Sequence, residues 1–453
     1  MDYSESNGQT PLSYEDWLSN IKGEKGDKGE KGDKGEKGDK GADGVGIESV
    51  RIDENGHLKI KYTNSQAEID LGKVKETDNY SVGLDFELNE AQTGYVLTGV
   101  GYCNDTKVVI PSEYNGKPVV AIKESAFAND GFIKVVEIPD SVTSIGERAF
   151  YYCSSLTSIE IGDSVTSIGD SAFRNCSSLT SIVIGNSVTN IGDSAFYDCY
   201  SLTSIEIPDS VTSIGSRAFG SCDSLTSITI PNSVINIGEG AFYYCDSLTS
   251  IEIPDSVTSI GDSAFRNCSS LTSITVDSNN TVYKSIDGNL YSKDGKTLIR
   301  YAAGKVETSF SIPDSVTNID EGAFYWCSSL TSIVIPDSVT SIDEGAFYYC
   351  DSLTSIEIPD SVTNIGEGAF LYCDSLTSIV IGNSVTSIGE DAFYCCDSLE
   401  SIVIPNSVTS IGERAFAGCS SLTIYCEVES KPSGWDSDWN IYNCPVVWGY
   451  KGN

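Results

Sequence analysis

One histidine and fifteen cysteines are the residues of this 453-residue chain whose chemistry is most restrictive. The histidine, His57, directly follows Asn55-Gly56, so an exposed turn residue is its simplest interpretation. Without a second histidine, a Ser-His-Asp or Cys-His arrangement could be built only around His57, and zinc sites of mixed Cys and His are excluded. The nearest approach to a phosphate-binding loop, residues 294–297, has Leu290 where that motif requires glycine. The sequence therefore predicts no catalytic residue, no metal site and no bound cofactor.

Most of the cysteines recur at one spacing, three residues after a repeated phenylalanine. Because they fall inside an apolar set, we predict a column of small buried side chains. Disulfides between stacked neighbours are the alternative. Cys103, Cys395, Cys426 and Cys444 lie outside this column, and Cys426 with Cys444 is a candidate disulfide clip. The members of the column are Cys153, Cys176, Cys199, Cys222, Cys245, Cys268, Cys327, Cys350, Cys373, Cys396 and Cys419.

Acidic residues dominate the charge, since 65 Asp and Glu against 28 Lys and Arg give a net charge of −37 and a pI near 4.1. Such a surface repels phosphate backbones and anionic lipid, so we expect no nucleic-acid partner. A catalytic pair of carboxylates needs two different environments, whereas these recur at equivalent repeat positions. A solvated acidic surface is therefore predicted, with calcium binding along the columns as the alternative. The recurring acids include Asp140, Asp163, Asp209 and Asp255, and also Glu147, Asp170 and Asp193.

No apolar run approaches the roughly 18 residues of a membrane-spanning helix, so no membrane insertion is expected. The first residues, MDYSESNGQT, lack the basic and apolar regions of a signal peptide. Export by another route, carriage on a particle and a start further upstream all remain open.

A repeat of 23 residues organises most of the chain. The interval from Phe265 to Phe324 is 59, or 23 + 36, so one coil carries an insertion of about 13 residues and there are about 13 coils. Burying the eight apolar side chains of one coil yields at most about 12–24 kcal/mol. Ordering 23 residues of backbone costs roughly 23–46 kcal/mol, so a single coil cannot fold alone. The sequence therefore predicts a solenoid whose stacked coils share a core and parallel β-ladders. The repeated phenylalanines are Phe127, Phe150, Phe173, Phe196, Phe219, Phe242, Phe265, Phe324, Phe347, Phe370, Phe393 and Phe416.

Each coil contains two extended stretches. The first, LTSIEI in residues 156–161, points Leu156, Ile159 and Ile161 inward, and the second, VTSI, ends at a glycine that permits a turn. The segment GERAFYYC, residues 146–153, is expected to form a single helical or 3₁₀ turn on the convex side.

The repeated residues closely resemble the BspA-like leucine-rich repeats, whose pattern is LxxIxIPxxVxxIGxxAFxxCxxL, over roughly residues 80–450. The resemblance implies a leucine-rich-repeat solenoid over 79–424, with an irregular coil at 276–311 in which Asp294-Gly295 turns a hairpin. Residues 425–453 resemble the C-terminal segment of that family, and Trp435, Trp439 and Trp448 can cover the open end of the core. The resemblance further implies surface display and binding of host or neighbouring-cell macromolecules.

Three smaller segments precede the solenoid. Residues 1–22 are predicted to form a helical leader, and residues 45–78 a small antiparallel β-module that turns at Asn55-Gly56. Between them, residues 23–44 carry glycine at every third position, as a collagen triple helix requires. This order resembles collagen-like segments of bacterial surface proteins and phage tail fibres, which implies a stalk and a homotrimer. A charge-balanced flexible tether is the alternative for 23–44.

Two surfaces vary from coil to coil. The strand face carries Glu137, Glu160, Glu206, Glu252 and Glu357, with Val183, Val334, Val380 and Val403 between them. The aromatic flank lies directly after the repeated Phe, and Tyr and Trp there suit protein interfaces and sugar stacking. We predict that the aromatic flank binds the ligand, with the alternative that its rings only cover the seam between coils. The predicted ligand-binding residues are Tyr151, Tyr152, Tyr243, Tyr244, Tyr325, Trp326, Tyr348, Tyr349 and Tyr372.

These features predict an extracellular or cell-surface binding protein, not an enzyme, that acts as an adhesin. Its expected partner is a protein or glycan of a host or neighbouring cell. A phage-encoded tail-fibre protein that binds a receptor, located on the virion, is the first alternative. An enzyme acting on cell-surface glycans is the second alternative.

Overall fold

The computed structural model describes residues 47–52, 57–62, 69–73 and 80–452. The predicted helical leader (1–22) and collagen-like segment (23–44) lie outside the described residues. The chain divides into two compact units, Met1–Glu76 and Thr77–Asn453.

The first unit contains a three-stranded sheet in the order β1 (Ile47–Ile52), β2 (His57–Tyr62) and β3 (Ile69–Lys73). Strands β1 and β2 are antiparallel on either side of Asn55-Gly56, as that dipeptide predicts. Strand β3 pairs antiparallel with β2.

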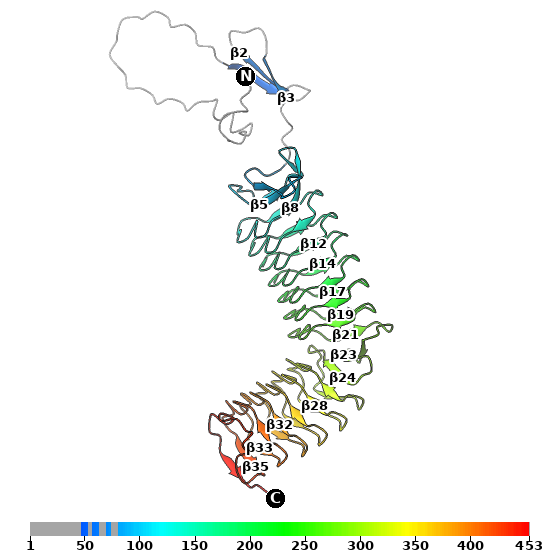
Figure 1. Ribbon diagram of the computed structural model, residues 1–453, viewed down its shortest axis with the longest axis vertical. Coiled ribbons are helices and arrows are strands. Elements are labelled where there is room, and N and C mark those ends of the chain that lie inside the picture. Colours follow the sequence, from blue (N-terminus) through cyan, green and yellow to red (C-terminus); the bar gives the residue numbers. More distant parts are fainter. Residues whose placement is uncertain (1–46, 53–56, 63–68, 74–79, 453) are drawn as a thin grey trace, which may run out of the picture. The chain divides into compact units, whose positions relative to one another are not determined.

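The second unit is a solenoid of about 15 turns once its irregular ends are included, against the about 13 coils predicted from the phenylalanines. Its coils stack through two ladders of short parallel strands, and no described residue is helical (Figure 1). The strands of the main ladder are β6 (Lys107–Val109), β9 (Val135–Glu137), β11 (Ser158–Glu160), β13 (Ser181–Val183), β15 (Ser204–Glu206), β17 (Ser227–Thr229), β19 (Ser250–Ile253), β21 (Ser273–Val276), β25 (Ser309–Ser311), β27 (Ser332–Val334), β29 (Ser355–Glu357), β31 (Ser378–Val380), β33 (Ser401–Ile404), β35 (Thr423–Cys426) and β36 (Val446–Trp448). The other strands are β4 (Asp85–Leu88), β5 (Tyr95–Gly99), β7 (Glu113–Tyr114), β8 (Lys117–Ile122), β10 (Ser144–Ile145), β12 (Ser167–Ile168), β14 (Asn190–Ile191), β16 (Ser213–Ile214), β18 (Asn236–Ile237), β20 (Ser259–Ile260), β22 (Tyr283–Ile286), β23 (Asn289–Ser292), β24 (Thr297–Arg300), β26 (Asn318–Ile319), β28 (Ser341–Ile342), β30 (Asn364–Ile365), β32 (Ser387–Ile388) and β34 (Ser410–Ile411).

The repeat sets the register, because each strand residue pairs with the residue 23 positions later, as Ile159 does with Ile182. Leu156, Ile159 and Ile161 are buried, which confirms the predicted inward set. The threonines beside the strands have a structural role, since the Thr180 hydroxyl donates to the Thr157 carbonyl at 3.1 Å. Such bonds recur from coil to coil and satisfy backbone carbonyls at the edge of the core.

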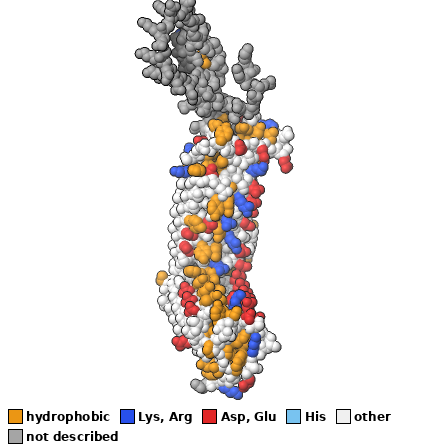
Figure 2. Space-filling model, turned by 90° about the vertical axis from the view of Figure 1, so that its left-hand side faces the viewer, with side chains coloured by type: hydrophobic (Ala, Val, Ile, Leu, Met, Phe, Trp, Pro, Cys, Tyr) orange, Lys and Arg blue, Asp and Glu red, His pale blue; other side chains and the backbone are white. Residues whose placement is uncertain are grey.

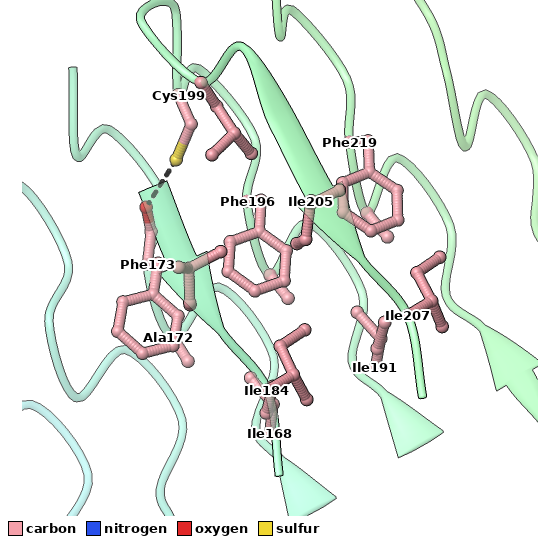
Figure 3. Close-up of a cluster of buried hydrophobic side chains, with 14 of the residues drawn as sticks. Ile168, Ala172, Phe173, Ile184, Ile191, Phe196, Cys199, Ile205, Ile207 and Phe219 are labelled. Atoms are coloured by element: carbon pink, nitrogen blue, oxygen red, sulfur yellow. Dashed lines mark hydrogen bonds between the residues drawn. The ribbon is translucent and has the colours of Figure 1, made fainter. Parts of the chain in front are cut away.

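The repeated phenylalanines form two stacks inside the core, one from Phe127 to Phe265 and one from Phe324 to Phe416. Phe173, Phe196 and Phe219 lie nearly parallel, with ring centroids 5.4 Å apart (Figure 3). Beside them, the Cys199 thiol donates to the Phe173 carbonyl at 3.2 Å, and the same bond recurs along the cysteine column. Each thiol thus fills a small apolar space and also satisfies a buried carbonyl of the preceding coil.

All fifteen cysteines are free thiols, and every member of the predicted column is buried. The alternative of disulfides along the column is therefore wrong. The predicted Cys426–Cys444 clip is also wrong, since both are free thiols inside the cap. Burial raises the pKa of the Cys268 and Cys327 thiols to about 12.

We expect thiol labelling of the native protein to modify Cys103 and Cys395 first, because they are the two partly exposed cysteines. The other thirteen (15 − 2) should react only after unfolding, since the reactive thiolate is disfavoured by burial and access is blocked. Mass spectrometry after timed labelling, with and without denaturant, measures this. Rapid native labelling of the column would contradict the buried arrangement.

The segment around each phenylalanine is not a helical turn, so that prediction was wrong. Two residues in it have left-handed backbone, as Arg148 (φ 53°) and Tyr152 (φ 58°) do on either side of Phe150. This alternation aims every second N–H at the next coil, so that Phe150 donates to the Ala172 carbonyl at 2.7 Å. A helical turn would direct these donors along its own axis and leave adjacent coils unpaired here.

The inserted coil interrupts the solenoid. Residues 283–300 form the antiparallel strands β22, β23 and β24, and β23 and β24 flank Asp294-Gly295 as predicted. Strand β20 has no partner on the side of the insertion, whereas β24 starts a new parallel ladder with β26. The buried core likewise falls into two clusters, which meet at Leu290 and Tyr291.

The C-terminal residues cover the last coil. The Trp439 ring packs edge-on against Phe416 with centroids 5.8 Å apart, and the Trp435 indole donates to the Val408 carbonyl at 3.2 Å. Both are buried, whereas Trp448 is 37% exposed. The predicted cap is therefore formed mainly by Trp435 and Trp439.

Candidate functional site

The aromatic flank is densest in the second half of the solenoid. Trp326, Tyr349 and Tyr372 follow one another on successive coils, with centroid separations of 4.8 and 4.7 Å. Tyr394 continues this row at 5.7 Å from Tyr372 and was missed because its coil has Cys395 at the position of Tyr372. The coils therefore bring rings 23 residues apart in the chain into one continuous row.

The first half holds two isolated pairs. Tyr151 and Tyr152 meet at 4.8 Å, and Tyr243 and Tyr244 at 4.5 Å. Figure 2 shows one face of the solenoid on which hydrophobic side chains form a band with basic side chains between them. Arginines do stand between tyrosines on neighbouring coils, since the Arg174 guanidinium lies 4.8 Å from the Tyr197 ring.

Tyr325 corrects one expectation, because it is only 4% exposed and belongs to the core at the insertion. Its ring lies 3.8 Å from the Arg266 guanidinium, which also lies 5.7 Å from the rings of Tyr243 and Tyr348. Tyr243 reaches Arg266 from the preceding coil, whereas Tyr325 reaches it across the insertion. The missed residue Arg266 thus joins the two halves of the flank.

The backbone beneath the half-buried aromatic residues disfavours the residues that occupy it. Tyr152, Tyr244, Trp326, Tyr349 and Tyr372 all have left-handed backbone, with φ between 55° and 59°. In this left-handed conformation a residue other than glycine costs roughly 1–2 kcal/mol in conformational free energy. Asparagine is among the residues that adopt it most readily. The coils without an aromatic residue at this position have Asn129, Asn175, Asp198, Ser221, Asn267, Cys395 and Gly418 there, so asparagine is the most frequent of them.

A cavity of about 350 Å³ lies at the insertion. Its walls include Tyr283, Tyr325 and Tyr348, the guanidinium groups of Arg266 and Arg300, and Leu371. A second hollow of about 530 Å³ shares Asp262, Ser263, Arg266 and Glu321 with it. Of these residues only Tyr325 and Tyr348 were predicted, because the others become neighbours only through the folding of the insertion.

The electrostatics of this cavity are mixed. Burial raises the pKa of the Asp320 and Glu321 carboxyls, and neighbouring carboxylates, among them Asp343 and Glu344 respectively, raise them further. Desolvation lowers the pKa of Arg300, which stays a cation at neutral pH. Burial also raises the pKa of Tyr243 to about 12, so its hydroxyl remains a donor.

The strand face consists of exposed glutamate and valine side chains on the strands of the main ladder. Glu160 and Val183 lie side by side on β11 and β13, and Val183, Val334 and Val380 are each more than half exposed. Among the described glutamates of the strand face, only Glu137 forms an ion pair, with Lys107 at 2.6 Å. The face offers small apolar contacts between solvated charges.

The recurring acids are partly structural. The Asp170 carboxylate accepts from the Asp193 N–H at 2.9 Å, and Asp193 accepts from Ser216 at 2.7 Å. Among the described residues no group of three His, Cys, Asp or Glu side chains is arranged to hold a metal ion. No described helix is long and apolar enough to cross a membrane.

Comparison with known proteins gives one family and several similar structures. The family described as "BspA type Leucine rich repeat region (6 copies)" matches residues 120–234, 189–294 and 303–423. No curated protein matches the chain.

Several solved structures of leucine-rich-repeat proteins are similar to this chain. A leucine rich cell surface protein from Faecalibacterium prausnitzii is 34% identical, with a TM-score of 0.61, over 82% of this chain and 97% of that one. A leucine-rich repeat protein from Bacteroides ovatus is 30% identical, with a TM-score of 0.57, over 81% and 91% of the two chains. One from Eubacterium ventriosum is 25% identical, with a TM-score of 0.55, over 83% and 95%.

Proposed function

The chain belongs to the BspA-type leucine-rich-repeat family, and from this premise we propose that it is a non-enzymatic binding protein displayed at the cell surface. Its aromatic flank holds a protein or glycan of a host or neighbouring cell. A similar protein is described as a leucine rich cell surface protein, which supports the location.

One observation carries the proposal: Tyr and Trp occupy a backbone position that disfavours them. Trp326, Tyr349 and Tyr372 occupy the left-handed position at which seven other coils have small or short polar residues, among them Asn175 and Asn267. A residue kept at a conformational cost of roughly 1–2 kcal/mol indicates a use outside the local fold. Large aromatic side chains contribute strongly to macromolecular interfaces, and they also stack on sugars.

Replacing Trp326, Tyr349 and Tyr372 together with asparagine should weaken binding of the full chain to target cells about tenfold or more. The fold should survive, because Asn175 and Asn267 occupy the same left-handed position. Flow cytometry with labelled protein on epithelial and bacterial cells measures binding, and thermal denaturation measures stability.

Tyr152→Asn is the matched control, since it makes the same change at an isolated ring pair. Its binding should stay within about twofold of the native protein. Unchanged binding by the triple variant, together with a lower melting temperature, would show that the rings only cover the seam between coils. Lost binding after Glu206, Glu252 and Glu357 are changed to Gln would assign the ligand to the strand face.

A further inference from the structure

The insertion leaves a row of backbone donors without a protein acceptor. In regular coils three N–H groups around each phenylalanine donate to the next coil, as Ser171, Phe173 and Asn175 do at 2.7–2.8 Å. The equivalent N–H groups of Ser263, Phe265 and Asn267 have no acceptor among the described residues. The reason is that the next turn has been replaced by strands β22 to β24, and Ser263 and Phe265 line the cavity instead.

The opposite wall is closed differently. In the coil after the insertion, the Ala323 carbonyl accepts from the Tyr301 N–H at 2.8 Å, whereas the Tyr325 carbonyl accepts from the Arg300 guanidinium at 3.0 Å. Arg300 also donates to the Gly322 carbonyl, which accepts from the Tyr325 N–H as well. Arg300 is 6% exposed and makes no ion pair in the described part of the chain, and its Nε has no partner. The Tyr325 carbonyl after the insertion is therefore bonded to Arg300. The N–H groups of Ser263 and Phe265 before the insertion have no acceptor among the described residues.

Glycines keep this cavity open. Gly322, Gly345 and Gly368 line it, and all three occupy the left-handed position two residues before the phenylalanine. Arg148 and Arg217 occupy that position in coils of the first half, so the position accepts a long side chain. The sequence EGAF therefore marks coils that leave room for a ligand, whereas the fold itself does not require glycine there.

The lining restricts the charge of what can bind. Six carboxylates line the cavity and repel an anion, whereas the guanidinium groups of Arg266 and Arg300 and the open N–H groups make one part of the wall positive. The six are Asp262, Asp320, Glu321, Glu344, Glu367 and Asp391. A neutral ligand rich in hydroxyl groups satisfies both walls, because a hydroxyl accepts from N–H groups and donates to carboxylates.

We propose that this cavity binds a neutral sugar unit of a glycan, with hydroxyl or acetamido oxygens against the N–H groups of Ser263 and Phe265. The sugar hydroxyls donate to the carboxylates of the opposite wall, and the tyrosine rings supply the apolar surface that a pyranose face packs against. The assignment rests on the proposed function, since it selects a glycan among the surface macromolecules considered above.

The test uses the full chain and a panel of neutral hexoses, 6-deoxyhexoses and N-acetylhexosamines with their disaccharides. Calorimetry should detect binding of at least one neutral sugar. Hydrogen exchange should slow in the peptide that contains Ser263 and Phe265, because their N–H groups become bonded to the sugar. A sialic acid, a glucuronic acid and a capped tetra-alanine peptide complete the panel.

The variant Gly345→Arg fills the cavity without disturbing the fold. Arg414 shows the expected arrangement, since it pairs at 2.7 Å with Glu390 of the preceding coil, and Glu321 is the equivalent partner for position 345. Sugar affinity should fall at least tenfold. Ser194→Arg, the same repeat position in a coil away from the cavity, should leave it unchanged.

Unchanged affinity in Gly345→Arg would overturn the proposal, as would binding of only acidic sugars, only the peptide, or nothing in the panel. Failure of the proposed function looks different. If soluble sugar binds and cell binding is unaffected by the Trp326, Tyr349 and Tyr372 changes, the cavity assignment stands and the aromatic flank loses its role. If those changes abolish cell binding while no sugar binds, the reverse holds.

Discussion

Replacing Gly215 with alanine is expected to lower the stability of the solenoid. A methyl group there would lie 2.6 Å from the Gly192 carbonyl carbon and 2.7 Å from the Asp193 nitrogen. Both are backbone atoms of the preceding coil, so the two coils must shift apart locally, as they do around Asp343, which occupies the same repeat position while β26 and β28 stay paired. Overpacking of this kind costs about 1–3 kcal/mol, a sizeable part of the roughly 5–15 kcal/mol that stabilises a typical protein.

Thermal and urea denaturation followed by circular dichroism measure this effect. Gly131→Ala is the matched control, because a methyl group there approaches only the Ser154 hydroxyl, at 4.0 Å. That variant should stay within about 0.5 kcal/mol of the native protein. Equal stability of the two variants would show that neighbouring coils can separate freely, contrary to the close stacking described above.

Replacing both Trp435 and Trp439 with alanine should destabilise the C-terminal coils and cause self-association. Each buried Trp→Ala change costs about 3–5 kcal/mol, and loss of Trp439 uncovers Phe416 at the end of the phenylalanine stack. An open solenoid end presents apolar surface and unpaired strands, which is why terminal caps keep such proteins soluble. Sedimentation velocity and thermal denaturation are the measurements.

Trp448→Ala serves as the control, since that side chain is 37% exposed and lies at the edge of the cap. Its sedimentation should match that of the native protein, with a smaller fall in melting temperature. If the Trp435 and Trp439 double variant stays monomeric and equally stable, residues 425–453 have no role in closing the core.

Much of the solenoid could be predicted because its information is local and repeated. Every 23 residues the same apolar set recurs, and a lone coil cannot fold, so stacking in parallel register is the only arrangement that buries Phe150 and its equivalents. The same reasoning located the cysteine column and the tryptophan cap. The turn around Phe150 was predicted wrongly, because its left-handed residues, among them Arg148, are not of types that signal this conformation.

The candidate site was predicted only in part. The aromatic row at Trp326, Tyr349 and Tyr372 followed from the repeat, since equivalent residues of successive coils must lie side by side. Tyr325 was placed with them on the same grounds, but it is buried against Arg266. The repeat pattern predicts the same burial for equivalent residues of every coil. The actual burial of a side chain also depends on the neighbouring coil, which differs at the insertion.

The sequence by itself determined the 23-residue period, the inward-pointing side chains and the stacking of coils in the second unit. The reason is that every coil buries its apolar side chains in the same way. Only the tertiary structure decided that the insertion replaces a turn, leaves the N–H groups of Ser263 and Phe265 without protein acceptors and seals the opposite wall with Arg300. These features depend on contacts between residues far apart in the sequence. Such contacts form at only one place, beside strands β22 to β24, so the repeated sequence pattern does not predict them.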